Sequence, residues 1–266
     1  MRETKKPIVE MRGIDKHYGG VHAVSGVDID VYSGEVHALV GDNAAGKSTL
    51  IKILSGAVAK SGGTISFAGK HAEISQPRDA KDLGIETVYQ DLALADNLDV
   101  ASNVFLGREM TKKGPFRFIL DNRSMIERSR SVLSRLKINI PNIRQRVRSM
   151  SGGQRQSIAI ARCVCFNAQV VILDEPTAAL GVEETRKVYA LIREMRDQGL
   201  AVLLISHNLN HIFENCDRIT VLKTGRLVGS RRVTETTQDE IVRMIVSGVA
   251  SEAPAAESAS ARAAKA

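Results

Sequence analysis

Aromatic residues and cysteines are scarce in this chain of 266 residues. Aromatic side chains make up only 4% of it, which disfavours a protein that stacks nucleic-acid bases on aromatic platforms. Cys163, Cys165 and Cys216 are an odd number of cysteines, and the first two are separated by one residue. That spacing fits neither the usual zinc sites nor a redox pair. We therefore expect reduced thiols in packed positions, as in a reducing compartment.

Long apolar runs are also missing. No stretch reaches the ~18 uninterrupted apolar residues that a membrane span requires. The most apolar segment, residues 159–173, is interrupted by Arg162, Asn167 and Gln169. The first residues carry charge but no apolar segment follows them, so a secretory signal is not expected. The sequence predicts a cytosolic protein.

The net charge of +7 allows more than one kind of partner. A basic surface suits nucleic acid, but it also suits a protein that binds a polyanionic nucleotide beside an anionic membrane. The basic residues are spread along the chain, and Arg144, Arg146 and Arg148 alternate with uncharged residues. Charge alone therefore does not identify the partner. Because the basic residues are dispersed and aromatic residues are few, we expect no nucleic-acid partner.

Short apolar runs alternate with segments of helical periodicity. Residues 36–40, 170–173 and 201–205 are continuous apolar runs that predict buried strands. Residues 47–54 and 183–198 have helical spacing, and each segment is closed by a glycine. Buried strands separated by helices predict an α/β fold with a mostly parallel sheet.

The remaining segments suggest two additions to this core. Helical patterns dominate residues 91–162, which predicts a helical subdomain inserted in the α/β core. The first forty residues and residues 218–233 look like antiparallel strands. We expect one domain, residues 1–248, followed by a disordered tail rich in Ala and Ser over residues 249–266.

The segment after the first predicted strand matches the pattern G-x-x-x-x-G-K-[ST]. Its residues are Gly41, Asp42, Asn43, Ala44, Ala45, Gly46, Lys47, Ser48 and Thr49. In such a loop, successive N–H groups and the start of the following helix surround a phosphate. Lys47 places a cation on the β- and γ-phosphate oxygens, and the Ser48 hydroxyl can bind Mg²⁺.

Two carboxylates follow the strand at 170–173. Ligands of parallel α/β sheets bind at the carboxyl ends of the strands, where Asp174 and Glu175 lie. Successive strand residues point in opposite directions, so the two side chains can have different roles. We expect Asp174 to hold Mg²⁺ and Glu175 to polarise an attacking water.

A second helix start has the features of an anion site. It consists of Ser151, Gly152, Gly153 and Gln154, followed by an amphipathic segment. Ser151 is a good helix N-cap, and the two glycines permit a close approach of the backbone. An ordinary capped helix would have the same local pattern. This motif therefore indicates an anion site only in combination with the phosphate loop and the two carboxylates.

In combination, these motifs resemble those of the ABC-transporter ATPases from Ile8 to about Gly248. The resemblance implies a P-loop NTPase core of the RecA type, with ATP and Mg²⁺ bound. It also implies that Tyr18 stacks on adenine and that Gln90 joins Ser48 and Asp174 around the metal. His207 would contact the γ-phosphate, and residues 151–154 of one subunit would cover the nucleotide of another.

Within that family, residues 97–109 and 175–182 look like those of monosaccharide importers of the ribose, xylose and fructose type. Many such ATPases carry two motor halves, whereas this chain has one motif set. The resemblance therefore implies a homodimer or a pair with another ATPase subunit. It further implies a membrane permease, an extracytoplasmic sugar-binding protein as an indirect partner, and a peripheral position on the cytoplasmic face of the membrane.

Three residues depart from the family pattern. Ala44 replaces a common glycine and Met150 a common leucine, and we expect phosphate binding to be retained in both cases. Gly181 stands where the family usually has an aspartate that contacts the partner subunit. We expect looser coupling between the two nucleotide sites, which Gly181→Asp would change.

Three alternatives stay open from the residues alone. A non-transport ABC ATPase acting on nucleic acid or ribosomes would usually have a long coiled coil or two motor halves. A regulatory module without hydrolysis would not need Lys47, Asp174, Glu175 and His207 together. A small-molecule phosphotransferase would leave residues 151–154 without a purpose.

Overall fold

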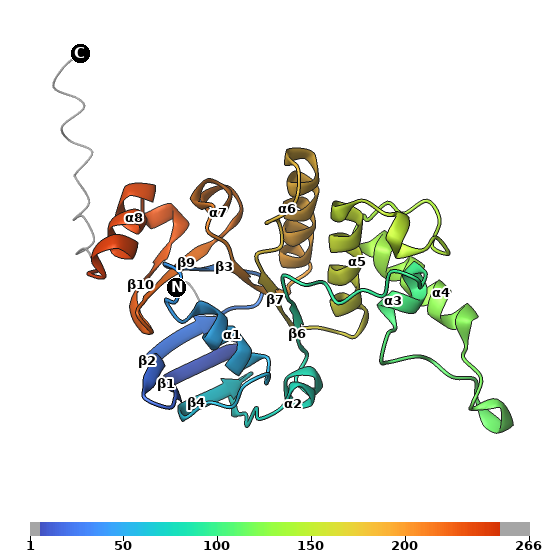
Figure 1. Ribbon diagram of the computed structural model, residues 1–266, viewed down its shortest axis with the longest axis horizontal. Coiled ribbons are helices and arrows are strands. Elements are labelled where there is room, and N and C mark those ends of the chain that lie inside the picture. Colours follow the sequence, from blue (N-terminus) through green and yellow to red (C-terminus); the bar gives the residue numbers. More distant parts are fainter. Residues whose placement is uncertain (1–5, 251–266) are drawn as a thin grey trace, which may run out of the picture.

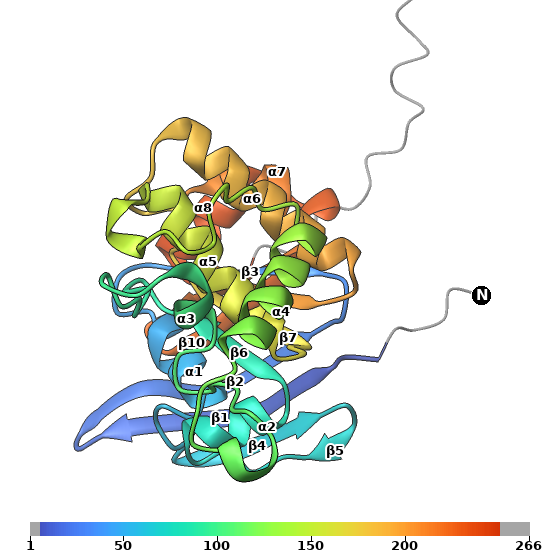
Figure 2. The same cartoon turned by 90° about the vertical axis from the view of Figure 1, so that its right-hand side faces the viewer.

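A six-stranded sheet and a four-stranded sheet organise the chain, whose computed structural model describes residues 6–250 (Figures 1 and 2). The strands are β1 Val9–Tyr18, β2 Val21–Val31, β3 Val36–Val40, β4 Gly62–Phe67, β5 Lys70–His71, β6 Ile85–Val88, β7 Val170–Asp174, β8 Ala201–Ile205, β9 Arg218–Lys223 and β10 Arg226–Arg232. The helices are α1 Lys47–Leu54, α2 Pro77–Asp82, α3 Val100–Val104, α4 Asn122–Arg135, α5 Gly152–Cys165, α6 Val182–Asp197, α7 Leu209–Asn215 and α8 Gln238–Ser247, and the short 3-10 turns are η1 Gly114–Phe116, η2 Val147–Ser149 and η3 Val233–Glu235.

The larger sheet has the strand order β10-β9-β3-β8-β7-β6. Neighbouring strands from β9 to β6 are parallel, and β10 is an antiparallel edge strand. Its central strands are continuously apolar because both faces are covered. Val171 and Leu173 face one core, whereas Val170 and Ile172 face the other. The predicted α/β fold with a mostly parallel sheet is confirmed.

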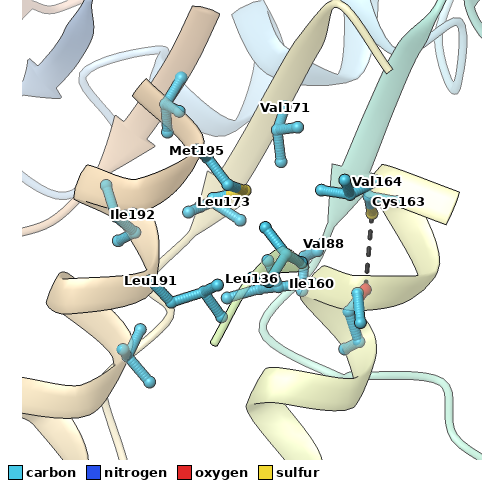
Figure 3. Packing of buried hydrophobic residues seen from close by; sticks show 14 of the residues in the cluster. Val88, Leu136, Ile160, Cys163, Val164, Val171, Leu173, Leu191, Ile192 and Met195 are labelled. Atoms are coloured by element: carbon cyan, nitrogen blue, oxygen red, sulfur yellow. Dashed lines mark hydrogen bonds between the residues drawn. The ribbon is translucent and has the colours of Figure 1, made fainter. Parts of the chain in front are cut away.

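Helices α3 to α6 contribute to the core on one face of this sheet. Figure 3 shows Ile160 of α5 and Leu191 of α6 packed close to Leu173 of β7. Cys163 belongs to the same core, and its Sγ donates to the Ala159 carbonyl 3.5 Å away. All three cysteines are free and buried, and burial raises the pKa of Cys163 to about 12. These thiols are packing residues, as the sequence predicted.

The smaller sheet, in the order β2-β1-β4-β5, is wholly antiparallel. Helix α1 belongs to the core that this sheet shares with the other face of the larger sheet (Figure 1). Leu50 and Ile51 of α1 belong to the same core as Ile65 of β4 and Ile172 of β7. This core fixes the start of α1 near the ends of the parallel strands.

The structure adds detail to two predicted segments. Strands β9 and β10 are antiparallel to each other, but β9 also pairs in parallel with β3, so both extend the larger sheet. Between residues 91 and 162, α3, α4 and α5 are joined by long irregular connections. The predicted tail lies outside the described residues from 251 onward. Within residues 6–250, no helix combines the length and hydropathy of a membrane-crossing segment.

The parallel strands bring three loops to one edge. Leu39 of β3 and Asp174 of β7 both pair with Ile205 of β8, so the three strands end at the same level. The loops that begin there carry the predicted phosphate, carboxylate and histidine residues. The sheet therefore assembles residues that are more than a hundred positions apart in the sequence.

Candidate active site

The loop of residues 41–46 has a backbone that requires glycine at two positions. Gly41 has φ +149, and a Cβ there would lie 2.1 Å from the Leu222 carbonyl oxygen. Gly46 has φ +96, and its Cβ would lie 2.7 Å from the Ala23 carbonyl oxygen. No side chain caps the N-terminus of α1 that follows. Free N–H groups at a tightly held loop and helix start are suited to an anion.

Ala44 lies in this loop with φ +64, in the left-handed region. An L side chain there costs about 1 kcal/mol relative to glycine. The exchange of the common glycine for Ala44 is therefore not conformationally neutral. Its side chain is exposed, so the cost comes from the backbone rather than from a clash.

Lys47 reaches back over the loop. Its Nζ donates to the Gly41 carbonyl at 2.7 Å and to the Asp42 carbonyl at 2.8 Å. Burial lowers the pKa of Lys47, and the negative charges of Glu175, Asp42 and Asp174 oppose that shift. Carbonyl oxygens are weaker partners for an ammonium group than phosphate oxygens. The lysine is thus positioned for exchange onto a more strongly charged ligand.

The two carboxylates after β7 have different environments. Burial, and then the charge of Glu175, raises the pKa of Asp174. Glu175 has φ +48, and its N–H donates to the Ile205 carbonyl at 3.0 Å. The alternation of strand residues, which we used to separate the two side chains, therefore ends at Asp174. The left-handed backbone of Glu175 turns the chain out of the strand. The two carboxylates therefore differ in direction because of this turn and not because of strand alternation.

Glu175 and His207 face each other across the strand ends. The distance from Glu175 Oε1 to His207 Nδ1 is 3.5 Å, and the histidine side chain is 77% exposed. Both residues also line a cleft of about 680 Å³ between α6 and α7, together with Ser206, Tyr189 and His211. The sequence motifs gave no sign of this cleft, because its walls come from separate segments.

The predicted Mg²⁺ ligands are all oxygen donors. Ser48 is exposed in the first turn of α1, Asp174 ends β7, and Gln90 follows β6 by two residues. Because β6 and β7 are parallel neighbours, Gln90 and Asp174 lie at the same edge of the sheet. One carboxylate, a hydroxyl and an amide suit Mg²⁺, which takes its other ligands from water and phosphate. No group of three or more His, Cys, Asp or Glu within residues 6–250 could hold a metal by itself.

Tyr18 lies at the end of β1 with its side chain accessible. The residue is 48% exposed, and Lys16 Nζ lies 5.0 Å from the ring centroid. Gly19 and Gly20 follow, and nothing lies within 4 Å of a Cβ built at either position. The ring is therefore open to a flat ligand.

The second predicted anion site begins α5. Ser151 Oγ accepts from the Gln154 N–H at 3.3 Å, and Gln154 Oε1 accepts from the Ser151 N–H at 3.1 Å. Side chains built at Gly152 and Gly153 would lie 2.9 Å from Leu180 and Glu184, respectively. The glycines therefore allow α5 to approach the start of α6. Helices α5 and α1 belong to cores on opposite faces of the sheet, so this chain does not bring the two anion sites together.

Glu184 was not predicted, although it lies beside the second anion site. Hydrogen bonds from the Ser151 hydroxyl and from the Gly153 and Gly181 backbones lower its pKa. Its carboxylate therefore faces groups that the sequence assigned to a phosphate. The only local signal is an acidic residue in the first turn of α6, which is ordinary for a helix.

Gly181 precedes α6 with φ −69, and nothing lies within 4 Å of a Cβ built there. The backbone does not require glycine at this position.

Comparisons with known proteins agree with these motifs. The ABC transporter family matches residues 24–178. A xylose/arabinose import ATP-binding protein of Sulfolobus acidocaldarius is 45% identical over 240 residues, which cover 90% of this chain and 94% of the relative. A fructose import ATP-binding protein of Rhizobium meliloti is 49% identical over 228 residues, or 84% and 87% of the two chains. A ribose import ATP-binding protein of Yersinia pestis is 40% identical over 91% of this chain, which spans only 47% of that relative.

Solved structures share the fold. A nucleotide-free ATP-binding cassette from an ABC transporter has a TM-score of 0.78 at 23% identity and covers 91% of this chain and 95% of its own. A second structure is that of cbiO1 from Clostridium perfringens, part of the ABC transporter complex cbiONQ. It has a TM-score of 0.75 at 27% identity and covers 91% of this chain and 94% of its own.

The family match covers more than half of the chain, and two relatives align over most of their own length. The phosphate loop, the carboxylates after β7 and His207 lie at one edge of the sheet that defines this fold. The chain therefore belongs to the ABC transporter family and is an ATP-hydrolysing subunit with a P-loop NTPase core.

Proposed function

We propose that this subunit energises the uptake of a monosaccharide through a membrane permease, with ATP held between two ATPase subunits. The alignment with xylose/arabinose and fructose import proteins over most of their length carries the transport part of this proposal. The non-transport alternative, an ATPase acting on nucleic acid or ribosomes, is not favoured by these relatives.

One subunit would bind most of the nucleotide. The exposed ring of Tyr18 stacks on adenine, and the N–H groups of residues 41–49 surround the phosphates. Lys47 exchanges its bonds to the Gly41 and Asp42 carbonyls for phosphate oxygens. Ser48, Gln90 and Asp174 would hold Mg²⁺, which would supply positive charge that neutralises the phosphate oxygens.

A second subunit would complete the site. Because α1 and α5 pack on opposite faces of one sheet, we assign their two anion-binding starts to different nucleotides. Ser151 and Gly153 of one chain then cover the γ-phosphate bound by the other. A homodimer satisfies this requirement, and so does a pair with a second kind of ATPase subunit.

Hydrolysis would be performed beside Glu175. Its carboxylate orients a water and accepts a proton from it as the water oxygen attacks the γ-phosphorus. The bond from the γ-phosphorus to the bridging oxygen breaks, which leaves ADP and inorganic phosphate. His207, 3.5 Å from Glu175, donates to a γ-phosphate oxygen. Positioning and charge neutralisation supply most of the rate in such reactions, so closure of the interface controls the chemistry.

The permease would dock in a groove beside Gln90. This groove has a volume of about 500 Å³ and is lined by Tyr89, Leu106, Arg108 and Phe166, among others. Tyr89 directly precedes Gln90, so movement at the nucleotide would reach the groove through one short segment. In this proposal the chain is a peripheral subunit on the cytoplasmic face of the membrane. The sugar-binding protein would act on the opposite side, through the permease.

Glu175→Gln tests the catalytic assignment. The amide keeps the shape of the side chain but cannot accept the proton, so turnover should fall at least about a hundredfold. The variant should still bind ATP, measured by equilibrium dialysis, because Glu175 does not hold the phosphates in this account. Turnover at the wild-type rate in the variant would refute the role of Glu175.

Purification from membranes tests the transport role. The tagged chain should bring down a polytopic membrane protein in amounts that approach one permease per pair of ATPase subunits. Recovery of ribosomes or nucleic acid in place of a permease would refute the importer proposal.

A further inference from the structure

Residues 110–121 form a hairpin whose apolar side chains are exposed to an unusual degree. Phe118 is 84% exposed and Phe116 58%, and Ile119 and Leu120 next to them are about half exposed. Elsewhere Val21 is exposed singly, and Val242, Val246 and Val249 form an exposed aliphatic group at the end of α8 that contains no aromatic residue. Figure 1 shows the hairpin extending to the lower right, away from α3 and α4. A compact apolar group of this kind marks a contact with a partner.

The hairpin has its own backbone hydrogen bonds. The Asp121 N–H donates to the Met110 carbonyl at 2.7 Å, and the Lys112 N–H donates to the Ile119 carbonyl at 2.9 Å. Thr111 and Leu120 form an antiparallel bridge, and η1 makes the turn. The apolar tip is therefore presented by a closed loop whose polar backbone groups are largely satisfied at its base.

The hairpin carries three cations and one carboxylate, Asp121, at its base. Lys112, Lys113 and Arg117 are its ionisable residues before Asp121, and none of them forms an ion pair with a carboxylate of the described chain. The guanidinium of Arg117 lies 5.1 Å from the Phe118 ring centroid. Asp121 is engaged elsewhere, since it caps α4 through the Ser124 N–H and hydroxyl. The exposed surface of the hairpin thus combines cations with aromatic and aliphatic groups.

We propose that this hairpin binds directly to the surface of an anionic lipid bilayer. Phe116 and Phe118 enter the boundary between head groups and acyl chains, while the three cations contact lipid phosphates. Basic residues beside aromatic and aliphatic groups are typical of such interfacial segments. This contact goes beyond the proposed function, because a subunit held by a permease needs no lipid contact of its own.

A protein partner or a nucleic acid fits the hairpin less well. A protein interface would be depleted in lysine at its centre, whereas two lysines lie on this hairpin. Sequence-tolerant nucleic-acid binding uses a groove that follows the backbone, and a protruding hairpin offers a tip instead.

The absence of tryptophan from the chain allows a direct test. Phe118→Trp introduces a single emitter at a position that is almost wholly exposed. We expect its emission to move to shorter wavelength when the full chain meets phosphatidylglycerol vesicles. Phosphatidylcholine vesicles should cause little shift, and Val246→Trp, an exposed position on α8, should respond to neither.

Vesicle co-sedimentation of two variants separates the contributions of charge and apolar surface. Each cation near an anionic surface is worth about fivefold in partitioning, so Lys112→Gln with Lys113→Gln and Arg117→Gln should weaken binding about a hundredfold. Phe116→Ser with Phe118→Ser should abolish the shift to shorter wavelength and most of the sedimentation. A matched control, Lys70→Gln with Lys187→Gln and Arg226→Gln, removes three exposed cations elsewhere and should bind more tightly than the hairpin variant. Thermal unfolding verifies that all variants are folded.

Several results would overturn the proposal. These are an unshifted spectrum on anionic vesicles, a shift only when a permease is present, an equal shift with a single-stranded oligonucleotide, or equal loss in the control variant. The hairpin contains none of the residues that we assign to ATP, so the ATPase activity without vesicles should not depend on it. Failure of lipid binding would therefore leave the proposed function standing.

Discussion

Ala44 and Glu175 both have left-handed backbones at the candidate active site, although neither is a glycine. The sequence identified the chemistry of Glu175 from its place after an apolar strand. It could not give the backbone angle, which depends on the hydrogen bond from its N–H to Ile205 on a neighbouring strand. Conformations fixed by a distant strand leave no pattern in the local sequence.

Ala44→Gly should stabilise the protein. Glycine adopts φ near +64 without the strain that alanine has there, so the free energy of unfolding should rise by about 1 kcal/mol. Urea denaturation measures the change, and ATP affinity should stay the same within twofold. Ala190→Gly, on an exposed part of α6 with ordinary angles, should have the opposite sign. A lower stability for Ala44→Gly would contradict the strain that we assign to this residue.

His37 should make the stability depend on pH. It is buried on β3 with its Nε2 2.7 Å from Thr220 Oγ1, and burial, aided by the positive charge of Arg218, lowers its pKa to about 3. Its unfolded pKa is about 6.5, so the unfolded chain takes up the proton first as the pH falls. The free energy of unfolding should therefore be lower near pH 5 than near pH 7 by about 2 kcal/mol from this residue.

The His37→Gln variant isolates that contribution. Glutamine can bond to Thr220 but does not titrate, so the difference in stability between these two pH values should shrink by about 2 kcal/mol. An unchanged difference would mean that His37 is not the titrating group.

At the scale of elements, the most apolar segments were predicted best. Strands β3, β7 and β8 and helix α1 formed where continuous apolar runs or helical spacing indicated them, because burial on both faces leaves a strong pattern. For β9, the sequence predicted the antiparallel pairing with β10, which is next in the chain, but not the parallel pairing with the distant β3. The hairpin at 110–121 was not predicted. Main-chain hydrogen bonds close it, and such bonds do not depend on side-chain type, so they leave no pattern in the sequence.

The junction of α5 and α6 makes a separate prediction. Glu184 places a carboxylate against Ser151 and Gly153, the groups that we assign to the γ-phosphate of the partner's ATP. Its carboxylate is ionised at neutral pH, so it repels an incoming phosphate. Glu184→Gln should therefore lower the dimer Kd in ATP several-fold, measured by analytical ultracentrifugation with the slow Glu175→Gln variant as background. Weaker dimerisation would show instead that the carboxylate holds α5 in its active position.

At the scale of the whole molecule, one chain carries every residue that we assign to ATP, but it does not bring the two predicted anion sites to the same nucleotide. The phosphate loop begins a helix on one face of the larger sheet, and Ser151 begins a helix on the other face. The sequence could predict both anion sites because each motif is local. The folded arrangement puts the two helices in different cores, which is the physical basis for proposing two subunits around each ATP.

Sedimentation velocity of the Glu175→Gln variant tests this central claim most directly. In ATP and magnesium the variant should sediment as a dimer, because it closes on ATP but does not hydrolyse it. In ADP it should sediment as a monomer, since the γ-phosphate that joins the subunits is missing. Adding Ser151→Arg should prevent the dimer without loss of ATP binding. A Glu175→Gln protein that remains monomeric while saturated with ATP, or that dimerises equally in ADP, would contradict the account.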